Sequence, residues 1–299
     1  MEEKTLKQEW ENIDARLQGI KNLPVLPTIL LKTMRILSNP KSDMNDLHLL
    51  LQNDPAITTK IMQVTNSSYY GFTKKIEKLR TSMVMLGMKE VGRLVTSVSL
   101  LSGFPRDKIS DRFEYSRFWL HSAAVGEVAQ AIVQRNNKSD SGELFTAGLL
   151  HDIGKLILSS YFTEDFLQCA KLADERNLPL AVAEQKILGV NHMQIGAYMA
   201  KKWGLSEMFR DVIRFHHLPA LAKKHRMEIS IVYLANRICW EYDVDFGSIP
   251  GSGRLDEDPI WDSLIENGYL SNKDEAEEIF ISASELIEHA KTMTELILL

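Results

Sequence analysis

The chain has 299 residues, of which 44% are hydrophobic and 25% are charged, as in an ordinary globular protein with a sizeable core. Its net charge of -5 argues against electrostatic capture of nucleic acid or of an anionic membrane. No apolar run has the length of a membrane span, and the charged N-terminus lacks the apolar core of a signal peptide. The two cysteines, Cys169 and Cys239, form no metal or redox spacing. We therefore expect a protein of a reducing compartment, the cytoplasm.

The first 105 residues show short helical patterns separated by polar turns, with no clear period-2 strand pattern. An amphipathic helix is expected over residues 1–20. Residues 23–27 are Leu-Pro-Val-Leu-Pro, and two prolines this close fix an extended connection before a helix that starts after Pro27. These patterns predict an N-terminal helical lobe over residues 1–105.

Capping signals predict the starts of further helices in this lobe. Asp43 or Asn45 is expected to cap one helix, and Asp54-Pro55 to begin the next. Thr81 is expected to cap another, and apolar periodicity predicts a last helix over about residues 89–101. A helix-turn-helix interpretation of the lobe is disfavoured, because the chain is acidic and shows no basic recognition face.

Residues 106–245 carry longer helical patterns and are expected to form a second lobe. Polar loops, glycines and prolines separate the patterns. The expected helices cover residues 112–134, the stretch around 147–155, and the stretches 166–173, 180–188, 192–203, 209–216 and 229–240. His151 and Asp152 are placed within a single, largely buried helix.

The remaining residues, 246–299, are expected to form a loop, over 245–259, followed by a long C-terminal helix. Ser271, with Asp274 three residues on, resembles a capping box. Apolar residues of the helix alternate at spacings of four and three between residues 279 and 297. This stripe either docks within the chain and completes the core, or forms a contact face for a protein partner together with the N-terminal lobe.

Polar side chains interrupt the apolar stripes of five separate helices in the second lobe. They are His121, His151 with Asp152, His192, His216 with His217, and Asn236. One histidine on an apolar face is usually a satisfied core residue, but convergence of several on one site satisfies them together. Imidazole and carboxylate are good ligands for divalent transition metals. A buried Asp152 needs a metal, a cation such as Lys155 or backbone donors. The other histidines, His48, His225 and His289, are interpreted as ordinary surface or boundary residues.

The order of these residues resembles that of the HD superfamily of metal-dependent phosphohydrolases. Features of residues 20–245 point to its HDOD branch: Leu-Pro-x-Leu-Pro at 23–27, Asn53-Asp54-Pro55, Asn66-Ser67 before Gly71, and Leu86-Gly87. The resemblance implies an all-α, two-lobed helical bundle, with an HDOD-type N-terminal lobe and an HD-like second lobe. It also implies a bacterial signalling or regulatory module, a class in which catalysis is often undemonstrated.

The resemblance also implies a set of metal ligands. The ligand positions of the superfamily fall on His121, His151, Asp152, His192, His216, His217 and, where the superfamily has a second Asp, Asn236. Asp152 would bridge two ions in this arrangement. The HD-GYP branch continues after its paired histidines with an acidic residue and Gly-Tyr-Pro, whereas this chain continues Leu-Pro-Ala-Leu over 218–221. This departure argues against cyclic dinucleotide hydrolysis of that type.

Asn236 changes the expected charge balance of the site. With Asp152 as the only carboxylate, two divalent ions would be poorly neutralised, because imidazoles are neutral and an amide oxygen is a weak donor. One or two ions of iron, manganese, nickel or zinc fit the histidine-rich set. Asp152 and Lys155 are the candidate catalytic residues. Lys155 would bind a phosphate or neutralise Asp152, unless it is a surface lysine.

Three functions of different classes follow. The favoured one is a regulatory module with a degenerate HD-type metal site that acts through a protein partner in a signalling pathway. The alternative is a metal-dependent phosphohydrolase acting on a nucleotide or other phosphoester, which the nearly full ligand set supports. Nucleic-acid binding is disfavoured by the charge of the chain.

Overall fold

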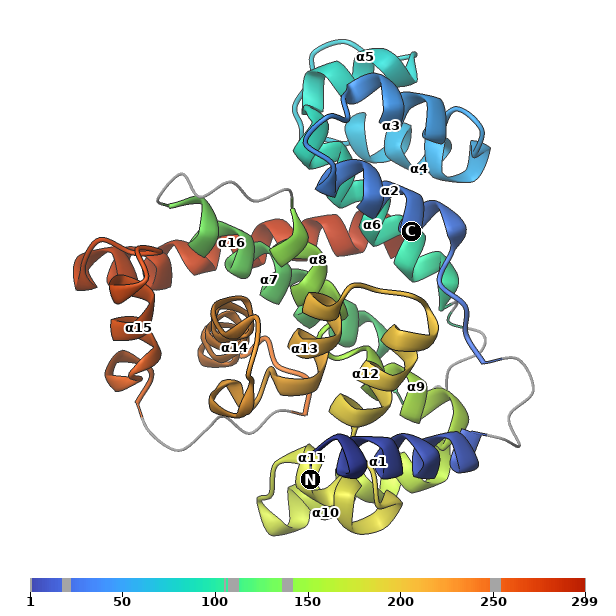
Figure 1. The fold of residues 1–299 in the computed structure, drawn as a ribbon. Coiled ribbons are helices and arrows are strands. Elements are labelled where there is room, and N and C mark those ends of the chain that lie inside the picture. The colour runs from blue at the N-terminus through green and yellow to red at the C-terminus, as the bar shows by residue number, and fades with distance from the viewer. Residues whose placement is uncertain are drawn as a thin grey trace.

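The structure is a computed structural model that describes residues 2–17, 23–104, 106, 113–135, 142–247 and 254–298. Across these residues the chain forms helices and turns, with no β-strand (Figure 1). The predicted all-α fold is confirmed. No described helix combines the length and the hydropathy that crossing a membrane would require.

The helices of the N-terminal part lie together at one end of the molecule, except the first, which packs on α12 (His192–Lys202) (Figure 1). They are α1 (Glu2–Leu17), α2 (Thr28–Ser38), α3 (Met44–Leu51), α4 (Pro55–Thr65), α5 (Leu79–Leu86) and α6 (Met88–Gly103). A small apolar cluster holds α3 to α6 together. It contains Leu47, Leu51, Ile57, Ile61, Met83, Val91, Val95 and Val98.

Two of the predicted caps in this part are present. Asp43 accepts hydrogen bonds from the backbone N–H groups of Asn45 and Asp46, and the Asp46 carboxylate accepts one from the backbone N–H of Asp43. This capping box begins α3 and decides between the two predicted caps in favour of Asp43. Asp54 caps α4 by accepting from the N–H of Ile57, with proline at the first helical position.

The predicted cap at Thr81 is wrong. Helix α5 already begins at Leu79, after an extended Lys78, and its first residue has no side-chain cap. The buried face of α5 carries Met83 and Ser82, whose hydroxyl pairs with that of Thr65 at 2.6 Å. The start is therefore set by packing against α4 rather than by a local capping signal.

The second part of the chain is built around the long helix α7, which packs against α8, α14 and α16. Its helices are α7 (Tyr115–Gln134), α8 (Glu143–Leu150), α9 (Ile153–Tyr161), α10 (Thr163–Arg176), α11 (Leu180–Leu188), α12 (His192–Lys202), α13 (Glu207–Phe215), α14 (Arg226–Glu241), α15 (Ile260–Glu266) and α16 (Lys273–Leu298), with 3-10 turns η2 (Pro219–Leu221) and η3 (Leu255–Glu257). The largest apolar cluster joins these helices to Ile13, Leu26 and Leu30 of the N-terminal part. The predicted boundaries at 105 and 245 stay predictions.

The single helix predicted around His151 and Asp152 is wrong. Helix α8 ends at Leu150 and α9 begins at Ile153, so the pair lies in the turn between them. The His151 ring binds the Gly148 carbonyl, and Asp152 has φ -99° and ψ 10°, outside the helical region. The break turns the carboxylate inward at the junction of two helices.

Several predicted boundaries shift. Helix α7 begins at Tyr115 rather than 112, and the predicted loop over 245–259 contains η3. The capping box predicted at Ser271 and Asp274 lies one residue later. The N–H of Glu275 donates to the Asn272 side chain, and the Glu275 carboxylate accepts from the Ser271 N–H. The parts of the predicted loops at 136–141 and 248–253 lie outside the described residues.

The apolar stripe of α16 is buried within the chain. Ile279, Ala283, Ala290 and Met293 are at most 7% exposed, and α16 packs on α7 and more weakly on α14, α15 and α4. Of the two alternatives for this stripe, the structure shows intramolecular docking. The C-terminal end of α16 lies beside the N-terminal part, where Met293 packs against Val64 and Leu94. This helix therefore contacts both parts of the chain (Figure 1).

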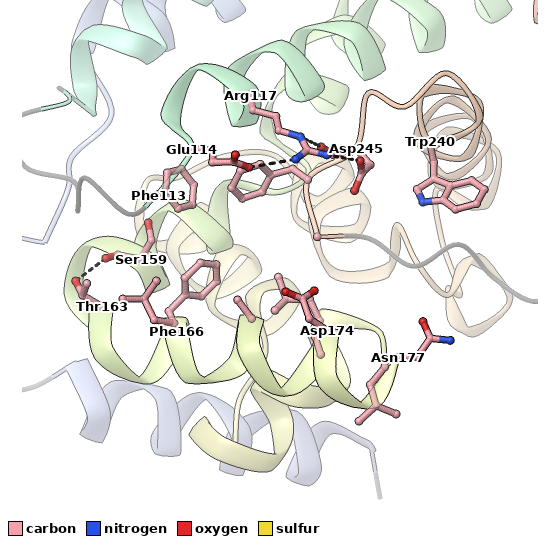
Figure 2. Close-up of a pocket in the computed structure, with 17 residues that line it drawn as sticks. Phe113, Glu114, Arg117, Ser159, Thr163, Phe166, Asp174, Asn177, Trp240 and Asp245 are labelled. Atoms are coloured by element: carbon pink, nitrogen blue, oxygen red, sulfur yellow. Dashed lines mark hydrogen bonds and ion pairs between the residues drawn. The ribbon is translucent and has the colours of Figure 1, made fainter.

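A short segment after α14, residues 244–247, crosses back to the start of α7 (Figure 2). Arg117 of α7 donates to the Asp245 carboxylate at 2.7 Å and to its backbone carbonyl at 3.1 Å. The ring of Phe246 packs on Phe113 and Phe118, with centroids 4.8 and 5.4 Å away. We call residues 244–247 the crossing segment.

Helices α9 and α12 pack backbone to backbone at Gly154. A Cβ atom added there would lie 1.9 Å from the carbonyl oxygen of His192 and 2.6 Å from its carbonyl carbon. Side-chain rearrangement cannot relieve a clash with backbone, so only glycine permits this approach. The contact places the turn bearing Asp152 beside the N-terminus of α12.

We predict that Gly154→Ala lowers the free energy of unfolding by more than about 3 kcal/mol, because α9 and α12 must separate. Gly92→Ala is the matched control, since the three atoms nearest to its added Cβ all belong to the Leu37 side chain, which can rotate away. The control should stay within about 1 kcal/mol of the parent, as alanine also favours a helix interior. Urea denaturation measures both, and equal losses in the two variants would contradict the proposed contact.

Candidate metal centre

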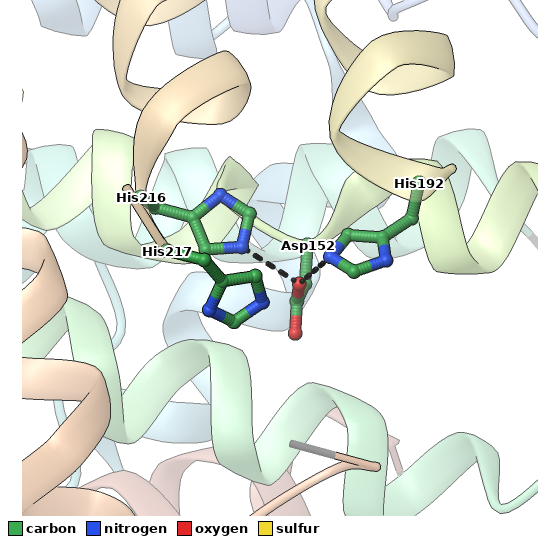
Figure 3. A group of neighbouring side chains, drawn as sticks. All are labelled: Asp152, His192, His216 and His217. Atoms are coloured by element: carbon green, nitrogen blue, oxygen red, sulfur yellow. Dashed lines mark ion pairs between the residues drawn. The ribbon is translucent and has the colours of Figure 1, made fainter. Parts of the chain in front are cut away.

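Four imidazoles surround the Asp152 carboxylate inside the protein. Helix α7 supplies His121, the α8–α9 turn supplies His151, the start of α12 supplies His192, and the end of α13 supplies His216. All five side chains are at most 1% exposed. The Nε2 atoms lie 3.5 Å (His121) and 3.3 Å (His151) from Oδ2 of Asp152, and 3.5 Å (His192) and 3.3 Å (His216) from Oδ1. The structure thus brings together residues that the sequence spreads over almost a hundred positions, and Figure 3 shows His192 and His216 on either side of Asp152.

The other ring nitrogen of each histidine is anchored. Nδ1 of His121 contacts the carbonyl of Val244 at 2.8 Å, that of His151 contacts Gly148 O at 2.6 Å, and that of His216 contacts Ile213 O at 3.0 Å. A carbonyl oxygen only accepts, so these three Nδ1 atoms carry the hydrogen and donate. In the neutral rings, Nε2 then carries a lone pair that faces Asp152.

An imidazole nitrogen with a lone pair and a carboxylate oxygen are both hydrogen-bond acceptors, so they cannot form a hydrogen bond with each other. The Nε2 atoms of the four histidines and Oδ1 of Asp152 are buried without a hydrogen-bond partner among the described residues. A buried polar atom without a partner is costly, and five such atoms close together favour a bound cation. The donor set fits a divalent transition metal, because neutral imidazole and carboxylate are its preferred ligands.

The ligand atoms divide into two groups that share Asp152. One group contains His121 and His151, and the other contains His192, His216 and His217; within each group the atoms lie within 4.8 Å of one another. His217 is less buried than the others and its ring stacks near that of His216, with centroids 4.1 Å apart. This geometry offers places for one ion or two.

Lys155 lies inside the same centre. Its Nζ donates to Oδ2 of Asp152 at 2.6 Å and to the carbonyl of Phe246, in the crossing segment, at 2.7 Å. The side chain is fully buried, so the surface alternative for Lys155 is wrong. Burial opposes ionisation of Asp152, yet the Lys155 ammonium and the His151 ring hold the pKa of its carboxyl well below its usual range. The lysine therefore neutralises Asp152.

Three histidines of the centre, His121, His216 and His217, are held neutral. Burial lowers the pKa of His216 to about 3, and burial likewise lowers the pKa of His121 and, further, of His217. The nearby Asp152 carboxylate opposes this shift but does not overcome it. Neutral rings at physiological pH are ready to bind a metal without first losing a proton.

Asn236, the candidate for the place of a second Asp, lies on α14 and is 5% exposed. It lines a cavity of about 650 Å³ together with His192 and His217. Its Oδ1 is buried and has no hydrogen-bond partner in the described part of the chain. Asn236 is thus on the open side of the centre, and its role as a ligand stays a prediction.

Glu184 also belongs to the centre, although the sequence did not predict it there. This side chain of α11 is fully buried, and its Oε2 accepts from the backbone N–H of His192 at 2.8 Å and contacts His192 Nδ1 at 2.6 Å. It fixes the His192 ring as carbonyl groups fix the other three. Its sequence signal was weak but present, since Glu184 follows Ala183 on the apolar side of a helix that ends shortly before His192.

The sequence matches the HDOD domain family over residues 23–219. The chain belongs to the HDOD family. The HDOD resemblance expected from the prolines at 23–27 and from the histidine order is therefore confirmed.

Relatives of this HDOD protein extend the match. An uncharacterised protein of Treponema pallidum (strain Nichols) is 28% identical over 219 residues, which are 73% of this chain and 42% of that protein. This chain thus spans less than half of that relative's length. A crystal structure of an HDOD domain protein of unknown function from Geobacter sulfurreducens has a TM-score of 0.78 and 24% identity over 94% of this chain and 98% of its own.

A crystal structure from Marinobacter aquaeolei VT8, provisionally named a signal transduction protein, has a TM-score of 0.76 and 20% identity over 97% of this chain and 66% of its own. Another from Shewanella amazonensis SB2B, provisionally named a phosphohydrolase, has a TM-score of 0.71 and 18% identity over 96% of this chain and 98% of its own. At these identities the likeness establishes a shared fold.

We predict that Glu184→Gln weakens metal binding by the HDOD protein about tenfold, because the amide lacks the charge that orients His192 and raises its basicity. Glu175→Gln, on the exposed face of α10, is the matched control and should bind metal as the parent does. Competition titrations with a chromophoric chelator measure both. Equal affinities in the two variants would show that the contact of Glu184 with His192 is structural only.

We also predict that the metal-free protein loses stability as the pH falls from 7.5 to 5.5. The unfolded chain takes up protons at its histidines below about pH 6.5, whereas the depressed pKa values of His121, His216 and His217 prevent uptake in the folded state. The raised pKa of His289 opposes this trend with one group. We expect a net loss of about 2–3 kcal/mol in urea denaturation. An unchanged free energy of unfolding would show that the imidazoles titrate normally in the folded protein.

Proposed function

We propose that this HDOD protein is a regulatory module of a bacterial signalling pathway, that its buried histidine centre holds a divalent transition metal, and that it acts by binding a protein partner. The observation that carries the metal part is the set of four inward Nε2 atoms around Asp152, none of which has another partner among the described residues. Iron, manganese, nickel and zinc all suit such a set. The name of the Marinobacter structure agrees with the signalling part.

Charge supports a regulatory rather than a strongly catalytic centre. Asp152 is the only carboxylate of both ligand groups, and Lys155 already binds one of its oxygens. A second divalent ion would therefore add positive charge that the buried Glu184 carboxylate behind His192 offsets only in part. The ligand set is in this sense degenerate, with asparagine at the place of a second carboxylate.

The partner part of the proposal is supported by the surface of the N-terminal helices. Residues 23–104 contain ten Lys and Arg against five Asp and Glu, in a chain whose net charge is -5. On α5, Val84 and Met85 are 67% and 55% exposed, with Arg80 and Lys89 exposed close by in sequence. Such a face complements an acidic segment of a partner that carries apolar side chains.

A second candidate function is hydrolysis of a phosphoester. The cavity of about 650 Å³ has the size of a small-molecule site and is lined by His192, His217 and Asn236. A bound metal would supply Lewis acidity and a water of lowered pKa. In this function His192 and His217 would orient the ion toward the cavity, and Lys155 would keep Asp152 ionised rather than contact the phosphate, since Lys155 does not line the cavity.

The two candidates differ in turnover. Metal analysis of the purified protein, followed by assays of the metal-loaded form with p-nitrophenyl phosphate, its diester and nucleotides, separates them. We expect bound metal without significant turnover. Turnover that depends on the loaded metal would favour the phosphohydrolase, and absence of metal after reconstitution would refute both.

We predict that the protein retains divalent metal after gentle purification and that His151→Ala lowers its occupancy. Loss of one ligand weakens binding to the folded state, so the variant should gain less thermal stability than the parent when metal is added. His48→Ala, in the N-terminal part, is the matched control and should keep full occupancy. Elemental analysis and thermal melts measure both, and equal occupancy in the two variants would place the metal elsewhere.

We predict a crossover for Asn236→Asp. The substitution is nearly isosteric, and it adds a carboxylate beside a buried cavity. Without metal this charge is unpaired, so the variant should be less stable than the metal-free parent. With manganese or iron it should be equal or more stable, bind metal more tightly and gain phosphoesterase activity. Equal metal-dependent shifts in thermal melts would show that Asn236 lies outside the coordination sphere.

A further inference from the structure

A second cavity, of about 600 Å³, is lined in part by Asp245, Phe246 and Gly247 of the crossing segment (Figure 2). It is distinct from the cavity at His217, and among the described lining residues the two share Leu180, Trp240 and Gly247. Its size is that of a site for a small organic molecule. Neither candidate function uses it.

The wall of this cavity is aromatic and acidic. Rings of Phe113, Phe166, Phe246 and Trp240 line it. The ionised groups are the carboxylates of Glu114, Asp174 and Asp245 and the guanidinium of Arg117, the one cation among the described lining residues. Arg117 already binds both Glu114, at 3.2 Å, and Asp245, at 2.7 Å.

The chemistry of this wall selects the charge of a ligand. The cavity wall has three carboxylates and one guanidinium, which already pairs with two of them. This excess of negative charge disfavours an anionic ligand and favours a cationic one. Aromatic faces accept a flat apolar body and also attract a cation. The matching ligand is a small organic cation with an aromatic or apolar body, such as an arylalkylammonium ion.

The same wall supports two residues of the metal centre. In the crossing segment, the carbonyl of Val244 accepts from His121 Nδ1 at 2.8 Å, and that of Phe246 accepts from Lys155 at 2.7 Å. Asp245 and Phe246 line the second cavity. One short stretch of chain therefore lines the cavity and also contacts a metal ligand and the Asp152 counter-ion.

We propose that this second cavity is an effector site for a small organic cation with an aromatic body, and that its occupation tightens metal binding through the crossing segment. A ligand packed on Phe246 and paired with Asp174 restricts this segment to the position in which its carbonyls hold His121 and Lys155. Less ordering then remains for the metal to impose, which is a positive coupling between the two sites. The coupling rests on the proposed metal centre, whereas the cavity does not.

Tryptamine is the probe for the cavity, and 3-(indol-3-yl)propionate, which replaces the ammonium by a carboxylate, is its matched control. Calorimetric titration of the metal-free full chain should show tryptamine binding about tenfold more tightly than the anion. Asp174→Asn should weaken tryptamine about threefold, as for an exposed ion pair, whereas Asp256→Asn, far from this cavity, should not. Equal binding of the two indoles, or no binding of tryptamine at millimolar concentration, overturns the assignment.

Cobalt(II) titrations, followed by visible absorption, test the coupling without any activity assay. With saturating tryptamine the cobalt affinity of the parent should rise at least about fivefold, and cobalt should tighten tryptamine by the same factor. A cobalt affinity that is unchanged or lowered by bound tryptamine overturns the coupling. Failure of the ligand-free protein to bind cobalt refutes the proposed function and the coupling together, while tryptamine binding by the metal-free protein still decides the cavity.

Discussion

The arrangement of the second part of the chain depends on one constraint: a buried carboxylate faces four lone pairs. Asp152 is fully buried, with Nε2 atoms of histidines from four separate places in the chain within 3.5 Å of its oxygens. Lys155 alone neutralises the carboxylate, and it leaves the four Nε2 atoms without partners among the described residues. Helices α7, α9, α12 and α13 can meet at this point only because glycine at position 154 lets α9 approach the backbone of α12.

Backbone carbonyls make this arrangement rigid. Three of the four histidines donate to main-chain oxygens, and the fourth contacts a carboxylate on α11, so each ring orientation is fixed by an element other than the metal. A centre of this kind is preorganised and loses little conformational entropy on binding. A displacement of those carbonyls would also displace the histidine rings. Of the segments that carry them, the crossing segment lines a cavity.

The sequence predicted the all-α class and most helices from helical periodicity, and the histidine order pointed to the residues around Asp152, though not to Glu184. It failed where long-range packing decides. The break after Leu150, the start of α5 at Leu79 and the burial of Lys155 follow from contacts with distant helices. His289 shows the same limit. Assigned to the surface or a boundary, it is partly buried on α16, and it pairs with Glu127 of α7, which also binds Arg93 of α6.

The net charge of the buried centre is relevant to both candidate functions. Without metal the centre contains the Asp152 carboxylate, the Lys155 ammonium and the imidazoles, and the Glu184 carboxylate contacts His192 from behind. A divalent ion adds two positive charges in a setting where burial makes net charge costly. Glu184 offsets part of this charge, and an anion on the open side, where the cavity at His192 and His217 lies and where Asn236 offers no charge, would offset more of it. Under the proposed function, a metal-loaded centre would attract a phosphate-like anion whether or not it cleaves one, and phosphoester binding without turnover would itself be a means of signalling. Asparagine at position 236 leaves more of that neutralisation to the ligand than a second aspartate would.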